Sequence, residues 1–407
     1  MNAALRKADT WLFWGILALL IVSSTQYSIE VTRKTFLSPA EPLIWGLFCL
    51  ALLLRVRHGR PTLGLPPLFG VLLVVWALLS AIPAANRMLS AKKILQLVEY
   101  FVLVRMLFSS AALDGPALRR IAWVLTGMAA VVVIVAAVQY FGGAVPDFDV
   151  RGTFVNRNVL GGYCALVLPL VYGLLLWDSR GLRRVGLGLL LAIGLVVVLS
   201  GASLLAVLLA LGAVSMLRGR WMFVTAALLV VLAALLVWPH LPRANGQALC
   251  ESIRLYDDQA AITKRYPEWQ AAGALVADNP WLGVGIGNYQ VNIGQYYGII
   301  PRMTGPTEAD TQNLYLVLAG SLGLPGLCCF LGLLFGAMAA AGRTFYTARE
   351  PWIRGLAAGL RGGLLGFAIN AVWSPLLVRG VGVLLAVFVA RAAALPRLNP
   401  AAGSRDA

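Results

Sequence analysis

Long apolar runs alternate with short polar connections along most of this 407-residue chain. A helix needs about 20 apolar residues to cross about 30 Å of hydrocarbon, so the alternation predicts about twelve membrane-spanning helices. They are expected at 11–29, 40–54, 64–84, 90–110, 118–141, 158–177, 185–200, 202–217, 221–238, 313–341, 355–376 and 379–395. The seventh and eighth meet at 200–203, where two separate spans would require a tight hairpin. The pattern therefore predicts an all-α polytopic membrane protein.

One long polar segment, from His240 to Gln312, interrupts this pattern. It divides the chain into an N-terminal bundle (1–238), a water-facing loop (239–312) and C-terminal helices with a tail (313–407). Inside the loop, Pro267 precedes EWQAAGALVAD, which predicts a membrane-surface helix that begins at the proline. A membrane protein that keeps one large polar loop is expected to hold its chemistry there.

Composition supports the same class. Hydrophobic residues make up 60% of the chain and charged residues 12%, against about half and about a quarter in soluble domains. The formal net charge of +16 would suit nucleic acid only if the basic residues shared one soluble face. Here the basic residues lie between apolar runs along the chain, so no nucleic-acid partner is expected. The five cysteines show neither CxxC nor His-linked spacing, which predicts no metal site and no disulfide framework.

Lysine and arginine residues fall on alternate connections, and this bias predicts the orientation. If twelve spans are right, the arginine-rich connections share one side, so that side and both termini are cytoplasmic. The first span is expected to be retained, because no small-residue cleavage site follows it. The long loop is then external, which in a bacterium means periplasmic or extracellular. Because no ATP or nucleotide sugar is supplied there, any reaction in the loop needs a substrate that arrives already activated.

The fourth predicted span carries polar residues at helical spacing. Lys92, Gln96 and Glu99 are separated by four and three positions, which places them on one helical face. Charged groups inside a membrane are costly and usually face a cavity or one another. We therefore interpret Lys92 and Glu99 either as a structural pair or as substrate contacts.

A short external loop carries Arg151, Asn156 and Arg157 directly before the sixth predicted span. Arginine presents a planar fork suited to phosphate oxygens, and a helix start adds oriented N–H donors. That combination would bind a pyrophosphate. The alternative is a pair of arginines that anchor the helix at the membrane interface.

The long loop holds further candidates. Arg265 lies just before the helix predicted at Pro267, and Glu268 lies within that helix. The glycines of PWLGVGIGNY form GxGxG, but they follow a predicted helix rather than a strand, so we expect a tight, closely packed turn and no dinucleotide site. An external general base must be His240 or a carboxylate such as Glu308 or Asp310, whose pKa desolvation can raise. A solvated loop face is the alternative for these acids.

Three segments resemble, in order and spacing, the signature regions of the O-antigen polymerase and O-antigen ligase superfamily. They are RGTFVNRNVLGGY, RYPEWQAAGALVADNPWLGVGIGNY and TQNLYLVLAGSLGLPGL, which extend from Arg151 to Leu327. The resemblance implies a GT-C type membrane glycosyltransferase fold in the bacterial inner (cytoplasmic) membrane. It also implies a donor glycan on undecaprenyl pyrophosphate, attack at the periplasmic face, and metal-independent transfer with inversion and without a cofactor.

Residue by residue, Arg151 and Arg265 match the family arginines that grip the donor pyrophosphate, with Arg157 as a neighbour. Stabilising the charge on a leaving pyrophosphate is work that arginines can do. Further residues are expected to support the site as polar side chains: Asn156, Glu268, Gln312 and Asn313.

The chain departs from the family pattern at two places. In the Ser-Gly-Ala-Ser region at 200–203, Ala202 and Ser203 stand where an arginine is often found. The other departure concerns a histidine of the ligases. They typically carry a histidine directly before the asparagine that opens the helix after the loop, and here Gln312 precedes Asn313. An amide cannot usefully accept a proton, so a histidine mechanism at that place is excluded. Glu308 and Asp310, four and two residues upstream, are therefore predicted to deprotonate or orient the acceptor hydroxyl.

The leading hypothesis is a polysaccharide polymerase that joins lipid-linked repeat units, with a chain-length regulator as a further partner. The alternative within the class is an O-antigen ligase whose acceptor is lipid A core. A secondary transporter would show the same topology, but no half-to-half repeat is evident and the polar residues crowd one surface. An inactive homologue that only binds lipid-linked glycan is the last alternative.

Overall fold

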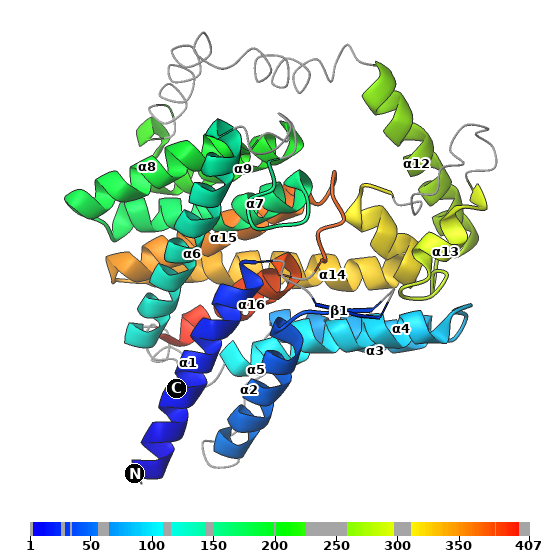
Figure 1. Ribbon diagram of the computed structural model, residues 1–407, viewed down its shortest axis with the longest axis horizontal. Helices are drawn as coiled ribbons and strands as arrows, with labels where there is room; N and C mark the ends of the chain where they lie inside the picture. The colour runs from blue at the N-terminus through cyan, green and yellow to red at the C-terminus, as the bar shows by residue number, and fades with distance from the viewer. Residues whose placement is uncertain are drawn as a thin grey trace.

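The computed structural model describes residues 3–25, 29–32, 35–55, 65–108, 115–142, 150–198, 201–222, 224, 259–296, 311–378 and 380–398. These residues form a mostly helical bundle (Figure 1). Each expected span corresponds to a helix or to consecutive helical segments, except the ninth (221–238), which lies almost wholly outside the described residues.

The first nine helical segments follow the hydrophobic pattern of the sequence. They are α1 (Ala3–Ser23), α2 (Ala40–Arg55), α3 (Leu65–Ser80), α4 (Arg87–Val98), the π-helical η1 (Glu99–Val104), α5 (Arg105–Phe108), α6 (Gly115–Phe141), α7 (Arg157–Trp177) and α8 (Leu182–Val197). The later ones are α9 (Gly201–Arg218), α12 (Gln259–Asp278), α13 (Tyr289–Ile293), α14 (Leu314–Thr347), α15 (Pro351–Asn370), α16 (Val381–Ala394) and the 3-10 turn η5 (Leu395–Leu398).

Three described helices, α6, α7 and α14, are long and apolar enough to cross a membrane. Shorter apolar stretches of 10–17 residues occur at Thr10–Ser23, Ala40–Leu53, Leu68–Ser80, Ser203–Arg218 and Val381–Ala394. A helical membrane protein is thus supported by length and composition, while the count of twelve spans and the GT-C architecture stay predictions.

Two expectations about local structure were wrong. The connection after α1 contains a short antiparallel hairpin of β1 (Ile29–Thr32) and β2 (Thr35–Leu37), with Ile29 opposite Leu37. The first helix therefore ends at Ser23 rather than continuing to 29, while the described residues remain mostly helical. The helix expected to begin at Pro267 begins at Gln259 instead, so the proline lies inside α12. A proline inside a helix removes one backbone hydrogen bond without necessarily ending the helix.

The centre of the bundle is the packing of α15 against α7, which run side by side in Figure 1. Small residues make this approach close: a Cβ on Gly363 would overlap the carbonyl oxygen of Leu166, and one on Gly366 would overlap that of Ala165. Membrane helices commonly pack through such small residues, because backbones can then come into contact. Nearly all of α7 is buried as a result.

Helix α14 is bent where it meets the described part of the long loop. Gly323 inside it has φ 71° and ψ 177°, and Pro325 follows two residues later. A Cβ on Gly323 would overlap the carbonyl oxygen of Trp281, so only glycine fits this conformation and this contact. Beyond the bend, α14 packs along α3, which lies beside it in Figure 1.

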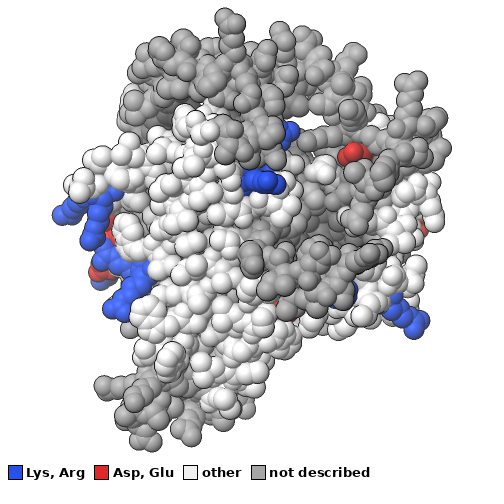
Figure 2. Space-filling model, in the orientation of Figure 1, with Lys and Arg blue, Asp and Glu red and all other residues white. Residues whose placement is uncertain are grey.

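The connections gather at two ends of the bundle. One, which we call the loop end, is formed by residues 81–86, 150–156, 279–288, 311–313 and 371–378, joined by bonds such as Leu314 N to Ala371 O at 2.9 Å. The other, which we call the arginine end, includes residues 115–119, 178–184 and 348–354 and holds the Arg119–Asp178 ion pair. Figure 2 shows charged side chains crowded at the left edge of the view, whereas most of the other described surface in this view is uncharged. Which end faces the periplasm stays a prediction.

Candidate functional site

The start of α7 presents the predicted phosphate-binding residues at the loop end. Asn156 caps the helix, its side chain accepting a hydrogen bond from Val159 N at 3.0 Å. The side chains of Arg151 and Arg157 are both exposed. Two exposed guanidinium groups beside a helix start form a patch that can bind an anion.

Gln139, near the end of α6, holds this loop in place. Its Oε1 accepts from the backbone N–H groups of Arg151 at 3.1 Å and Gly152 at 2.8 Å, and its Nε2 donates to Gly152 O at 2.9 Å. The hydroxyl of Thr153 ties the same loop to Ser24 O at the end of α1, at 2.9 Å. The backbone beside Arg151 is therefore fixed from two helices while its side chain faces outward. Sequence reasoning missed Gln139, whose only signal was a polar residue near the end of an apolar run.

A buried polar pair lies against the first turns of α7. Ser203 Oγ at the start of α9 donates to Asn370 Oδ1 at the end of α15, at 3.0 Å, and both residues are fully buried. The space is so tight that a Cβ on Gly161 would overlap Ser203, and one on Gly162 would lie 3.3 Å from Asn370 Nδ2. Within the described residues, Asn370 Nδ2 has no hydrogen-bond partner. Asn370 was also missed, although an asparagine inside a predicted span is itself a signal.

The glycine-rich turn between α12 and α13 docks onto α14 and the α3–α4 turn. Gly283, Gly285 and Gly287 all have positive φ, at 65°, 96° and 79°. Each also approaches neighbouring backbone too closely for a side chain, so the predicted tight turn is confirmed. Val284 N donates to Gly320 O at 2.8 Å, and Leu324 N donates to Pro280 O at 2.8 Å.

Asn288 fastens the end of this turn to the start of α4. Its Oδ1 accepts from Asn86 N at 2.7 Å, and its Nδ2 donates to Asn86 O at 3.2 Å and to Ser90 Oγ at 2.9 Å. Ser90 Oγ in turn donates to Ile286 O at 2.7 Å. Asn288 is fully buried, so this group of bonds is shielded from water.

The segment before α14 is held by its own cap and by α13. Asn313 accepts from Tyr315 N at 2.9 Å and Leu316 N at 3.1 Å, so it is the N-cap of α14. Two residues earlier, the hydroxyl of buried Thr311 lies 2.6 Å from Tyr289 Oη. Gln312, between them, is half-buried. His240, Glu308 and Asp310, the candidate bases, lie outside the described residues.

Helix α12 packs its apolar face, Ala271, Ala272 and Leu275, against Tyr289 and Ile293. Arg265 lies on this helix, but its side chain lies outside the described part. Glu268 is half-buried and its Oε2 atom is fully buried. The described loop residues thus form a small apolar cluster of their own against α14.

At the end of this cluster, Tyr296 Oη donates to Asp278 Oδ2 at 2.9 Å. Partial burial and then the carboxylate of Asp278 raise the pKa of Tyr296 above its ordinary value of 10.0.

The polar residues of the fourth predicted span differ in exposure and in their hydrogen-bond partners. Lys92 is exposed, whereas Glu99 is buried and accepts from Trp45 Nε1 at 2.8 Å. The chain of contacts runs instead from Lys93 Nζ to Gln96 Oε1 at 3.1 Å, and from Gln96 Nε2 to Tyr100 Oη at 2.8 Å. The roles of Lys92 and Glu99, as a structural pair or as substrate contacts, stay predictions.

Among the described residues, no three His, Cys, Asp or Glu side chains lie close enough to hold a metal ion.

Part of the chain matches the model of a known protein family. Residues 186–331 match the family model described as O-antigen ligase. The match runs from α8 through the long loop to a point beyond the bend of α14, and it includes Arg265, Gln312 and the glycine-rich turn. Curated proteins gave no match to the chain. The predicted superfamily is thus supported over the segment that contains the loop.

Proposed function

We propose that this chain, whose residues 186–331 carry a domain of the O-antigen ligase and polymerase superfamily, polymerises lipid-linked glycan units at the periplasmic face of the bacterial inner membrane. In this reaction, a hydroxyl of the acceptor sugar attacks the anomeric carbon of a glycan on undecaprenyl pyrophosphate. A glycosidic bond forms with inversion, and the bond between that carbon and the phosphate oxygen breaks. Undecaprenyl pyrophosphate leaves with the bonding electrons.

The observation that carries the proposal is the convergence of the three signature segments on the end of α15. In the first segment, Gly162 lies against Asn370. Gly161 lies against Ser203, which is hydrogen-bonded to Asn370. The third begins beside the next residue, because Leu314 N donates to Ala371 O. The second docks on the third through Val284 N and Gly320 O. The first segment lies more than 100 positions before the other two, yet all three thereby meet at one end of the bundle, as one site requires.

Arginines fit the donor role at this end. We assign the pyrophosphate to Arg151, Arg157 and Arg265, with Asn156 fixing the first turn of α7 beside them. A guanidinium group donates two parallel hydrogen bonds to phosphate oxygens and stays charged throughout the reaction. Arginines can therefore stabilise the negative charge that develops on the leaving group without a bound metal.

The acceptor is assigned to the segment that ends at Thr311. Its tie to Tyr289 fixes the position from which the chain leads back to Asp310 and Glu308. One of these carboxylates takes the proton of the attacking hydroxyl, and His240 is the next candidate. Gln312 and Glu268 support the acceptor and donor sides respectively through their amide and carboxylate groups.

An O-antigen ligase is the second candidate, and the description of the matched family favours it. Its acceptor would be lipid A core instead of another lipid-linked glycan. Gln312 stands against it, because the ligase histidine expected at that position would supply the base.

The two candidates give different products. Purified protein in lipid nanodiscs would receive an undecaprenyl-pyrophosphate oligosaccharide, alone or with lipid A core. We expect a ladder of lengthened lipid-linked products from the donor alone, resolved by gel electrophoresis and mass spectrometry. Transfer only onto lipid A core would establish the ligase instead. Binding of the lipid-linked glycan without either product would overturn both.

The residue assignments have their own test. Arg265→Ala is expected to abolish product while leaving membrane insertion intact, and Arg265→Lys should restore part of it. Glu308→Gln and Asp310→Asn should lower kcat by about 10²- to 10⁴-fold for whichever carboxylate is the base. Unchanged rates in both would transfer the role to His240.

A further inference from the structure

A cavity of about 530 Å³ lies at the arginine end, opposite the site described above. Its walls come from α6, the α7–α8 turn and the start of α15. Three arginines, Arg119, Arg180 and Arg183, line it, together with Trp177 and Trp352. Neither the superfamily match nor the proposed transfer reaction uses these residues.

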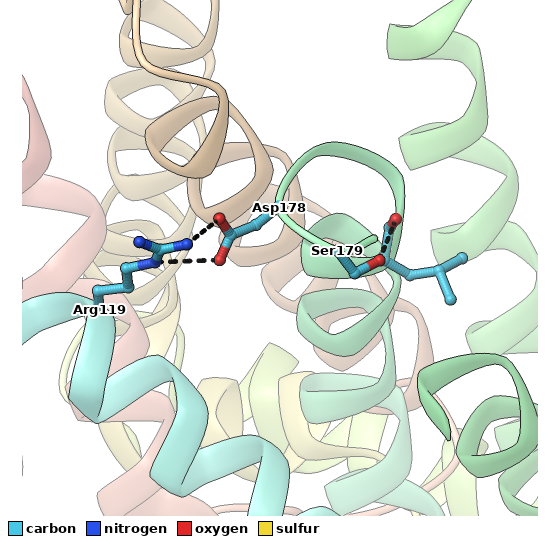
Figure 3. A network of polar contacts seen from close by, with 4 residues as sticks. Arg119, Asp178 and Ser179 are labelled. Atoms are coloured by element: carbon cyan, nitrogen blue, oxygen red, sulfur yellow. Dashed lines mark hydrogen bonds and ion pairs between the residues drawn. The ribbon is translucent and has the colours of Figure 1, made fainter. Parts of the chain in front are cut away.

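One wall of the cavity is held by an ion pair (Figure 3). Arg119 Nη2 lies 2.5 Å from Asp178 Oδ1, and its Nε lies 3.2 Å from Oδ2, so the guanidinium engages the carboxylate with two parallel bonds. Asp178 is also the C-cap of α7, and neighbouring Ser179 Oγ donates to Leu175 O at 2.7 Å. Arg119 and Asp178 therefore neutralise each other and fix the geometry of the wall.

Besides this ion pair, the lining holds one acidic and two basic side chains. Glu350 is the other acidic lining residue, and Arg180 and Arg183 are both exposed. Arg183 lies over the ring of Trp123, with 5.8 Å from its Cζ to the ring centroid, which orients the guanidinium without neutralising it. The lining thus carries a net positive charge that an anion can balance.

The start of α8 adds to this preference. No side chain caps the helix, and its first turn holds Arg183 and Arg184 but no acidic residue. The N-terminus of a 16-residue helix bears partial positive charge, so this arrangement leaves unfavourable charge unless a negative group lies nearby.

Apolar side chains border the same cavity. Leu182, which lines it, is 86% exposed, and Val185 one turn further along α8 is 58% exposed. Trp177 and Trp352 are half-buried, as is common for tryptophan where the hydrocarbon meets the headgroups. A free phosphate would leave these apolar surfaces in water, whereas a phospholipid would cover them with its acyl chains.

We propose that this cavity binds the headgroup of an anionic phospholipid from the membrane leaflet at the arginine end. Its phosphate lies between Arg180 and Arg183 at the start of α8, and its acyl chains pass over Leu182. The proposal is independent of glycan transfer, because it concerns the end of the bundle away from the catalytic assignments.

Native mass spectrometry of the full-length protein, released from detergent with phosphatidylglycerol or phosphatidylcholine, tests the site. We expect preferential retention of phosphatidylglycerol. Each arginine near an anionic lipid surface contributes about fivefold to affinity, so Arg180→Gln with Arg183→Gln should weaken retention about 30-fold. The matched control is Arg343→Gln with Arg349→Gln, which removes two exposed arginines from the same end but outside the lining.

Equal retention of the two lipids, or equal loss in both double variants, would overturn the proposal. Inorganic phosphate forms the second arm, measured as thermal stabilisation of detergent-solubilised protein. Stabilisation by phosphate that depends on Arg180 and Arg183, without lipid selectivity, would identify a free anion as the ligand and refute the lipid assignment. Phosphatidylcholine retention reports that the double variant is folded.

Discussion

Replacing Asn288 by alanine should release the glycine-rich turn and α13 from the start of α4. The change removes three hydrogen bonds that join Asn288 to Asn86 and Ser90, at 2.7, 3.2 and 2.9 Å. Each typically contributes about 0.5–1.5 kcal/mol net, and the Asn86 N–H loses its acceptor. We therefore expect the free energy of opening this region to fall by about 2–4 kcal/mol.

Hydrogen exchange measures that opening directly, because amide protection falls tenfold for each 1.4 kcal/mol, about 30- to 1,000-fold here. The amides of residues 281–293 should lose this protection in Asn288→Ala, while those of α7 and α15 keep theirs. Gln295→Ala, at an exposed position beyond α13, is the control and should change protection by less than about threefold.

Two results would refute the reasoning. Unchanged protection of 281–293 in Asn288→Ala would mean that the glycine contacts with α14 hold the turn without the asparagine. Loss of protection throughout α7 and α15 would mean that the hydrogen bonds of Asn288 stabilise the whole bundle and not the loop alone. Only the local loss, together with lower glycan transfer, would connect the turn to the proposed acceptor site.

Three further expectations follow from other parts of the structure. Arg151→Ala should lower kcat/KM for the lipid-linked donor by about 10²- to 10³-fold, and Arg151→Lys should recover part of that loss. Arg87→Ala, at the same end, should leave kcat/KM unchanged. Equal losses in both alanine variants would contradict the assignment. Gly363→Leu should prevent α15 from packing on α7 and remove the monodisperse peak in fluorescence size exclusion, whereas Gly186→Leu, with open space at its Cβ, should retain it. The pKa of Tyr296 is raised in the folded state, so its contribution to stability should be complete below about pH 10 and lost as pH rises through the folded pKa. The Tm of the wild type should therefore fall more at alkaline pH than the Tm of Tyr296→Phe. Parallel curves of Tm against pH would contradict this.

Hydrophobic patterning predicted most of the helices because each is a run of apolar residues bounded by polar ones. The start of α7 was predictable in more detail, since Asn156 before an apolar run is a capping signal and the structure shows it as the N-cap. The turn at Gly283, Gly285 and Gly287 was predictable for a similar local reason, because glycines tolerate positive φ.

The pattern could not predict the polar contacts between distant segments. Ser203 and Asn370 are 167 positions apart, and Asn86 and Asn288 are 202 apart, so no local periodicity relates them. The start of α12 was missed for a different reason. Pro267 is favoured at a helix start, but tertiary packing of the apolar face of α12 also accommodates it inside the helix.

The position of the proposed site depends on residues that lie far from it. Asn370 can meet Ser203 of α9 only if α15 has the correct axial register on α7 and α9, and a slip of one turn would move it by about 5.4 Å, beyond hydrogen-bonding reach. That register is set along the helix by backbone contacts such as those of Gly363 and Gly366. Because Ala371 follows Asn370 and accepts from Leu314, the same register also sets where α14 begins. The glycines of α15 therefore determine the distance between the proposed donor segment at α7 and the proposed acceptor segment before α14, although none of them needs to contact substrate.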